Sequence, residues 1–160
     1  MSIKNIFYPK IIQEKELLFP NELSNNIDET LLDKIKHKLG NRCSKEGYIE
    51  KDTIEILERS LGMLDTSHFS GNIVYDIKLK VNTCNPLEGD VLDCTIMGKN
   101  KIGIICKKGP LLIALSKIHH EDNLDIFDSL DKHDKIKVEV ICSKYELNDT
   151  EIRVIAKLKN

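Results

Sequence analysis

The stretch Asn72–Pro86, NIVYDIKLKVNTCNP, carries a long strand pattern and ends at the point where the organisation of the chain changes. One face of the predicted strand is apolar, with Ile73, Tyr75, Ile77, Leu79 and Val81. The other face is polar, with Asp76, Lys78, Lys80 and Asn82. This alternation is typical of a half-buried strand. Asn85-Pro86 interrupts it, so we predict a domain boundary there, between residues 1–85 and residues 86–160.

The segment before this strand predicts a second strand and one helix. Residues 10–19 (KIIQEKELLF) have strand character, which Pro20 ends. Residues 26–40 (NIDETLLDKIKHKLG) predict a helix that is capped by Asn26 or Asp28, with acids in its first turn and bases in its last. We expect Gly40 to end it in the left-handed conformation. Residues 40–60 predict a loop with at least one short strand, and residues 61–70 an irregular segment.

The segment after Pro86 has an all-β pattern. Strands are predicted at Gly89–Met97, Lys101–Cys106, Leu111–Ser116, Lys135–Cys142 and Ile152–Leu158. A longer acidic connection, residues 119–134, lies between the third and fourth of these, and its LDIFDSL core predicts a helical turn. Alternation places Cys94, Cys106 and Cys142 inside, as small core residues. Five short strands with this insertion predict an OB-type barrel.

Composition and spacing exclude several classes of function. The net charge of −2 argues against a protein that coats nucleic acid by bulk electrostatics, so any such contact needs a local patch. We see no apolar run of membrane length and no signal-like N-terminus, and expect a protein inside a cell without membrane contact. The five cysteines form no CxxC pair, and His119-His120 lacks a third ligand, so we predict no metal and no cofactor. No acid, base or nucleophile constellation predicts catalytic residues.

Several sequence motifs, in this order, resemble the motifs of one protein family. They are ELLFPNEL (16–23), CSKEGYI (43–49), VYDIKLKVNTCNPLEGDVLDC (74–94) and NKIGIICKKGPLLIALS (100–116). Together they resemble the stalk subunits of multisubunit DNA-directed RNA polymerases, the seventh subunit of RNA polymerase II and its archaeal counterpart. The chain length and the abundance of lysine, isoleucine and asparagine are similar to those of the versions that large cytoplasmic DNA viruses encode.

The resemblance implies an α+β protein in two parts, a truncated RNP-like tip followed by a five-stranded OB barrel of the ribosomal S-one type. It implies no catalytic activity and no cofactor. It implies that the tip docks on the polymerase core, against the largest subunits and the clamp, beside a fourth-subunit-like stalk partner. The barrel would lie near the nascent RNA. For a viral protein the expected location is the cytoplasmic viral factory and the virion, and otherwise the nucleus.

Two sets of candidate site residues follow. In RNA-binding barrels of this class an aromatic and a histidine stand where this chain has Ile105 and Ala114, so we read both as surface or barrel filling and expect no base-stacking platform. Loose phosphate contact is then expected from Lys99, Lys101, Lys107, Lys108, Lys144 and Tyr145. The alternative is that these lysines only decorate solvated turns.

Apolar residues in loops of the first part predict polymerase docking. The candidates are Pro20, Leu23, Leu61, Met63, Leu64 and Phe69, together with Gly47 and Tyr48 of the CSKEGYI motif. The alternative is that the loops fold back on the helix and complete a small core. A different class of protein, a free-standing OB-fold RNA-binding protein of translation or RNA processing, is the second hypothesis for the whole chain.

Overall fold

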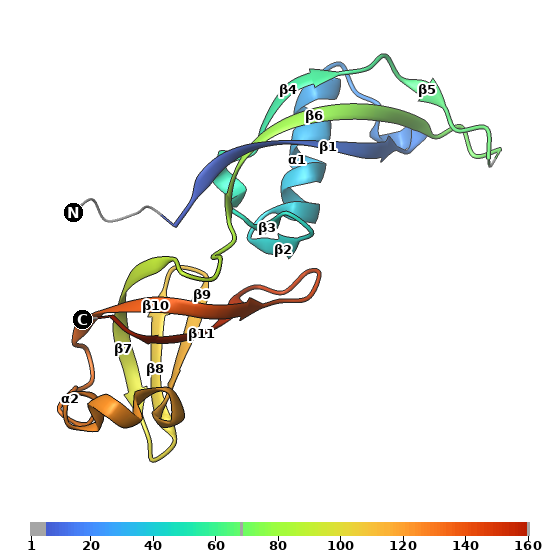
Figure 1. Cartoon of the computed structure of the whole chain (residues 1–160). Helices are drawn as coiled ribbons and strands as arrows, with labels where there is room; N and C mark the ends of the chain where they lie inside the picture. The colour runs from blue at the N-terminus through green and yellow to red at the C-terminus, as the bar shows by residue number, and fades with distance from the viewer. Residues whose placement is uncertain (1–5, 68, 160) are drawn as a thin grey trace. The chain divides into compact units, whose positions relative to one another are not determined.

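The computed structural model describes residues 6–67 and 69–159, which form two units (Figure 1). The first, here the N-terminal unit, consists of Phe7–Arg42 and Ile49–Thr83. The second, here the barrel unit, contains the chain from Cys84 onward and the segment Cys43–Tyr48.

A strand pair organises the N-terminal unit. β1 (Tyr8–Leu18) runs antiparallel to β6 (Ile73–Cys84), from the pair Tyr8 and Thr83 to the pair Leu18 and Ile73. β4 (Glu55–Arg59) and β5 (Met63–Leu64) also pair with β6. The sheet has the order β1-β6-β3-β2, and of β2 (Arg42–Ser44) and β3 (Gly47–Ile49) only Arg42 and Ile49 belong to this unit. Two 3-10 turns, η1 (Pro20–Glu22) and η2 (Lys51–Thr53), complete it with helix α1 (Ile27–Leu39).

The core of this unit lies between α1 and β6, as the alternation in β6 predicts. Tyr75, Ile77, Leu79 and Val81 are buried, and Ile73 is half-buried. They pack in one cluster with helix and strand residues that face them. The cluster contains Ile12, Leu18, Leu31, Ile35, Ile49, Ile54, Tyr75, Ile77, Leu79 and Val81.

The ends of α1 confirm one sequence prediction and correct another. The Asn26 side chain accepts a hydrogen bond from the Glu29 N–H, so Asn26 is the N-cap. Gly40, expected in the left-handed conformation, is extended at φ −66°, and the left-handed residue is Asn41 at φ 55°. A glycine is needed at position 40 for space, because a Cβ there would lie 2.4 Å from the Lys36 carbonyl oxygen.

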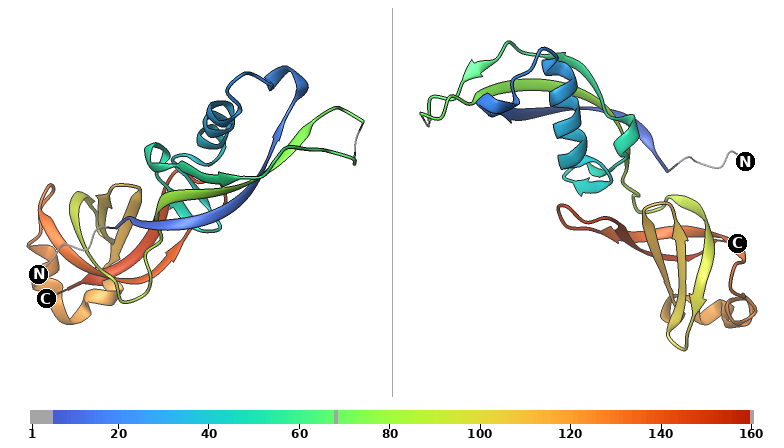
Figure 2. Two further views of the ribbon diagram at one scale, coloured as in Figure 1. Left: turned by 90° about the horizontal axis from the view of Figure 1, so that it is seen from above. Right: turned by 180° about the vertical axis from the view of Figure 1, so that it is seen from behind.

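The barrel unit is a closed five-stranded barrel with OB topology. Its strands are β7 (Val91–Lys99), β8 (Gly103–Lys108), β9 (Leu111–Ser116), β10 (Lys135–Lys144) and β11 (Ile152–Leu158). They close in the order β10-β11-β9-β8-β7, in which only β9 and β11 are parallel (Figure 2). η3 (Lys117–Asn123) and α2 (Leu124–Asp128) fill the connection between β9 and β10. This arrangement confirms the predicted barrel.

His120, one of the two histidines in this connection, is a satisfied core residue. Its side chain is buried and lies against the Phe127 ring at a centroid distance of 4.8 Å. Nδ1 lies 2.6 Å from the Ser116 carbonyl oxygen, and the Leu158 N–H donates to Nε2 at 2.8 Å. The ring therefore donates at Nδ1 and accepts at Nε2, and joins the end of β9 to the end of β11.

Cys142 corrects the expectation that three cysteines lie inside the barrel. Cys94 and Cys106 are buried, but Cys142 is exposed. The pairing of β10 with β11 shifts register between Val140 and Cys142, because a β-bulge inserts one extra residue. After an inserted residue the alternation is reversed, so the side chain that was expected to face inward faces outward.

This exposure predicts that one thiol reacts first in the native protein. Burial, and next the nearby Asp149 charge, raise the pKa of the Cys43 thiol to about 11, and burial raises the pKa of Cys84 to about 12. Because the other four cysteines are all buried, Ellman's reagent at pH 8 should modify Cys142 rapidly and the others only on unfolding. Cys142→Ala should remove the fast phase. A fast phase of two or more thiols would contradict the structure.

Candidate functional site

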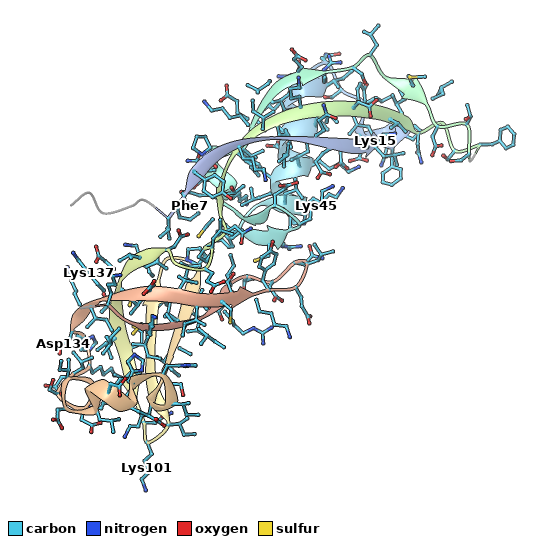
Figure 3. The ribbon with its side chains drawn as sticks, in the orientation of Figure 1. Phe7, Lys15, Lys45, Lys101, Asp134 and Lys137 are labelled. Carbon is cyan, nitrogen blue, oxygen red and sulfur yellow. The ribbon has the colours of Figure 1, made fainter. Side chains whose placement is uncertain are left out.

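The structure divides the six predicted RNA contacts among different parts of the barrel unit. Lys101 lies in the turn between β7 and β8, and Lys107 and Lys108 end β8 (Figure 3). Lys99 is engaged elsewhere, since its Nζ donates to the carbonyl oxygens of Asp128 and Leu130 at 2.5 and 3.3 Å. It therefore holds the residues at and after the end of α2.

The remaining two candidates lie at the far end of β10. Lys144 is exposed and pairs with Arg153 of β11. The Tyr145 hydroxyl donates to the Lys45 carbonyl oxygen at 3.4 Å, which ties it to the segment Cys43–Tyr48 of the same unit. The six residues therefore do not form one patch.

A hollow of about 580 Å³ on the outer wall of the barrel gathers two of these lysines with two that sequence reasoning missed. Its lining is Asp93, Cys94, Thr95, Lys107, Lys108, Gly109, Lys135, Ile136 and Lys137. Thr95 is central, because it pairs with Lys135 on one side and with Lys107 on the other. Four lysines face one carboxylate, so the hollow favours an anion.

Lys135 and Lys137 could have been found from the sequence with one further step. They occupy the outward positions of the predicted fourth strand. In a closed barrel of this order the fourth strand pairs with the first, which brings β10 beside β7. Barrel closure, and not local sequence, is thus the signal that joins them to Lys107.

Ile105 and Ala114 lie on the surface and do not fill the barrel. They pair across β8 and β9, and both are exposed. Ala114 also pairs with Ile155, which is exposed as well. The row is aliphatic, so it offers no aromatic face on which bases could stack.

The N-terminal unit exposes most of the predicted docking residues. Leu61, Met63, Leu64 and Phe69 are between 69% and 111% exposed, so the alternative that they complete the core of this unit is wrong for them. Leu23 is 41% exposed and Pro20 is exposed.

These loops meet at one end of the sheet (Figure 1). Met63 and Leu64 pair with Val74 and Ile73, and Ile73 pairs with Leu18 on its other side. A Cβ on Gly71 would lie 3.3 Å from the Pro20 ring. We call this surface the apolar end of the sheet, and it comprises Phe19, Pro20, Leu23, Leu61, Met63, Leu64 and Phe69.

Phe19 is a member that sequence reasoning did not single out. Phe19 is 47% exposed, and the Lys34 ammonium lies 4.7 Å from its ring centroid. The Phe19 N–H donates to Glu22 Oε1, which also accepts from Lys34 Nζ. These bonds lower the pKa of the Glu22 carboxyl, the Phe19 backbone bond first. The loop at this end is therefore locally ordered.

Gly47 and Tyr48 lie outside the apolar end of the sheet, in the segment grouped with the barrel unit. Gly47 is buried at φ 103°, and a Cβ there would lie 2.6 Å from the Cys84 carbonyl oxygen. The segment is held by hydrogen bonds from the Cys43 N–H to the Asp149 carbonyl and from the Asn148 N–H to the Cys43 carbonyl. Gly47 thus has a structural reason to be glycine.

A second hollow, of about 680 Å³, lies on the N-terminal unit and has no net preference for charge. Its lining is Gln13, Glu14, Lys15, Glu58, Arg59, Ser60, Asp76, Ile77 and Lys78. Three acids face three bases there. Among residues 6–67 and 69–159, no group of three or more metal-ligating side chains converges. In the same part of the chain, no helix has the length and apolarity needed to cross a membrane.

Comparison with known proteins relates the whole chain to RNA polymerase subunits. No protein-family model matches it. It is 25% identical, over 99% of its length and 84% of the relative, to a protein named as a DNA-directed RNA polymerase subunit in Acanthamoeba polyphaga mimivirus. It is 23% identical to the DNA-directed RNA polymerase II subunit 7 of Arabidopsis thaliana and 22% identical to subunit RPB7 of Glycine max, each over 75% of the chain and 67% of the relative. The chain is thus similar to a viral DNA-directed RNA polymerase subunit along almost its entire length, and to subunit 7 of plant RNA polymerase II over three quarters of its length, which confirms the resemblance in its sequence motifs.

Proposed function

We propose that this chain is a non-catalytic stalk subunit of a multisubunit DNA-directed RNA polymerase. The observation that carries the proposal is similarity to a viral polymerase subunit over 99% of the chain, on a fold that ends in an OB-type barrel. The mimivirus relative favours a viral polymerase, with the cytoplasmic viral factory and the virion as its location. For a cellular polymerase II the location is the nucleus.

The N-terminal unit, a truncated RNP-like tip in this proposal, docks on the polymerase core. The apolar end of the sheet supports this role, because several large apolar side chains exposed in one region are typical of an interface. The partners are the largest subunits and the clamp, with a fourth-subunit-like stalk partner beside them.

The barrel contacts the exiting transcript weakly and without reading its sequence. The lysine-lined hollow supports phosphate contact, and the aliphatic row of Ile105, Ala114 and Ile155 provides no stacking of bases. Contact by lysines is sensitive to salt, because phosphate binding releases counterions.

Copurification tests the proposal. A tagged form of the chain, expressed in its native source, should bring down the two largest polymerase subunits in near-equal amounts after a 300–500 mM salt wash, on the order of the concentrations that remove loosely held basic proteins. Recovery of the chain as a free monomer that captures RNA, with no polymerase subunit, would instead indicate a free-standing OB-fold RNA-binding protein.

A further inference from the structure

We infer that single-stranded RNA follows a basic stripe that winds around the outside of the barrel and is anchored in the lysine-lined hollow. The stripe comprises Lys107, Lys108, Lys135, Lys137, Lys144 and Arg153. The inference rests on the proposed function and deepens it, since it names the path of the RNA backbone and excludes two of the lysines that the sequence suggested.

Strand register defines the stripe. Lys135 of β10 pairs with Thr95 of β7, and Thr95 pairs with Lys107 of β8. Lys107 pairs with Leu112 of β9, and Leu112 pairs with Arg153 of β11. Arg153 pairs with Lys144, at the other end of β10. One continuous row of pairs therefore encircles the barrel and returns to the strand on which it began.

The members of this row face outward, and four of its six positions are basic. Lys135, Lys107, Arg153 and Lys144 are exposed, whereas Thr95 and Leu112 are half-buried and uncharged. Adjacent strands lie about 4.8 Å apart, so the row crosses roughly 24 Å of surface without meeting a carboxylate. A flexible polyanion is a partner that suits such a narrow, long stripe, because its charges repeat along a line.

The lysines of the hollow are available to a ligand. Within the described residues, Lys107, Lys108, Lys135 and Lys137 form no ion pair, whereas Lys157 and Lys159 are both paired with Glu139, at 3.7 and 3.9 Å. The one carboxylate of the hollow is Asp93, which stands opposite Lys137 in the register.

The two ends of the stripe differ in strength. The Lys144 and Arg153 end adjoins the loop between β10 and β11, which carries Glu146, Asp149 and Glu151. The carboxylates of this loop repel a phosphate that binds at Lys144 and Arg153. The hollow is therefore the anchor, and the Lys144 and Arg153 end adds a weaker contact.

Along β8, β9 and β11 the stripe runs beside the aliphatic row of Ile105, Ala114 and Ile155, two residues away on the same outward face. That row offers no aromatic ring for stacking, so the stripe reads no bases. Lys99 and Lys101 lie outside it, since Lys99 is bonded to carbonyls near α2 and Lys101 lies in the β7–β8 turn.

A titration of fluorescein-labelled single-stranded oligo(U) and oligo(A) against the full-length protein, at several KCl concentrations, tests the stripe. The triple variant Lys107→Ala, Lys135→Ala, Lys137→Ala should weaken binding by at least about tenfold at low salt and reduce the slope of log K against log salt by about 2. Both RNAs should be affected equally. Replacement of the same lysines by arginine should retain binding.

The matched control is Lys101→Ala, Lys117→Ala, Lys132→Ala, which removes the same charge from the barrel outside the stripe and should leave the affinity and the slope nearly unchanged. The inference would be overturned by an equal loss of RNA affinity in the two triple variants, by no loss in the variant of Lys107, Lys135 and Lys137, or by no RNA binding of the unmodified protein. Copurification with the polymerase core is a separate readout: the first triple should still assemble, and a failure of the unmodified chain to assemble would overturn the proposed function instead.

Discussion

Gly103→Ala should destabilise the barrel unit by about 3 kcal/mol and lower its melting temperature by about 15 °C. A Cβ at position 103 would lie 2.1 Å from the Leu115 carbonyl oxygen of the neighbouring strand. That atom belongs to the backbone, so no side-chain rotation relieves the clash, and β8 and β9 must move apart. Differential scanning calorimetry of the full-length protein measures the effect.

Gly98→Ala is the matched control, because a Cβ there would meet no atom within 4 Å. Gly98 lies on β7 and pairs with Ile105, so both substitutions add one methyl group to the same barrel. The control should change the stability by less than about 1 kcal/mol, with a small gain from the lower flexibility of the unfolded chain. Equal melting of the two variants would show that β8 and β9 are not packed as the structure has them.

Met63→Glu together with Leu64→Glu should abolish assembly with the polymerase core, with binding weakened at least about 100-fold. Both side chains lie at the apolar end of the sheet and are 70% and 69% exposed, so the substitutions add charge to the proposed docking surface without entering a core. The fold of the isolated chain should be unchanged, as circular dichroism checks. Copurification of the polymerase core measures assembly.

The control for this pair is Leu87→Glu with Leu147→Glu in the barrel unit. These leucines are 65% and 69% exposed, so the change in charge and exposure is closely matched. The control should assemble as the unmodified chain does. Retained assembly by Met63→Glu, Leu64→Glu would place the docking surface elsewhere, and would leave the homology to polymerase subunits as it stands.

The sequence predicted those elements whose pattern is local and long. The alternation in β6 and the capped, amphipathic pattern of α1 each bury their own apolar face, so composition and period were sufficient. The barrel was predicted for the same reason, from five short alternating runs and one insertion.

The errors arose where the conformation of a single residue depends on contacts that the local sequence pattern does not show. Gly40 is required by the space beside the Lys36 carbonyl and the Lys51 side chain, and the left-handed turn falls on Asn41. Cys142 faces outward because the pairing of β10 with β11 contains a bulge. The sequence pattern of β10 does not predict this bulge.

The candidate RNA contacts show the same division. Lys107 and Lys108 stand out beside a glycine turn, but their neighbours Lys135 and Lys137 come from the other side of a closed barrel. Lys99 resembles a free surface lysine in the sequence, yet it bonds to carbonyls near α2 that only the fold brings close. The exposure of Leu61 and Phe69 likewise required knowledge of what the helix and sheet leave uncovered.

The position of β11 between β9 and β10 has a consequence for synthesis on the ribosome. β11 is made after the other barrel strands, but it lies between β9 and β10 and supplies the parallel seam. Until translation passes Leu158, β9 and β10 each keep an unpaired edge, which is a template for pairing with another chain. The unfinished barrel therefore exposes two strand edges, and insertion of the last strand covers both of them.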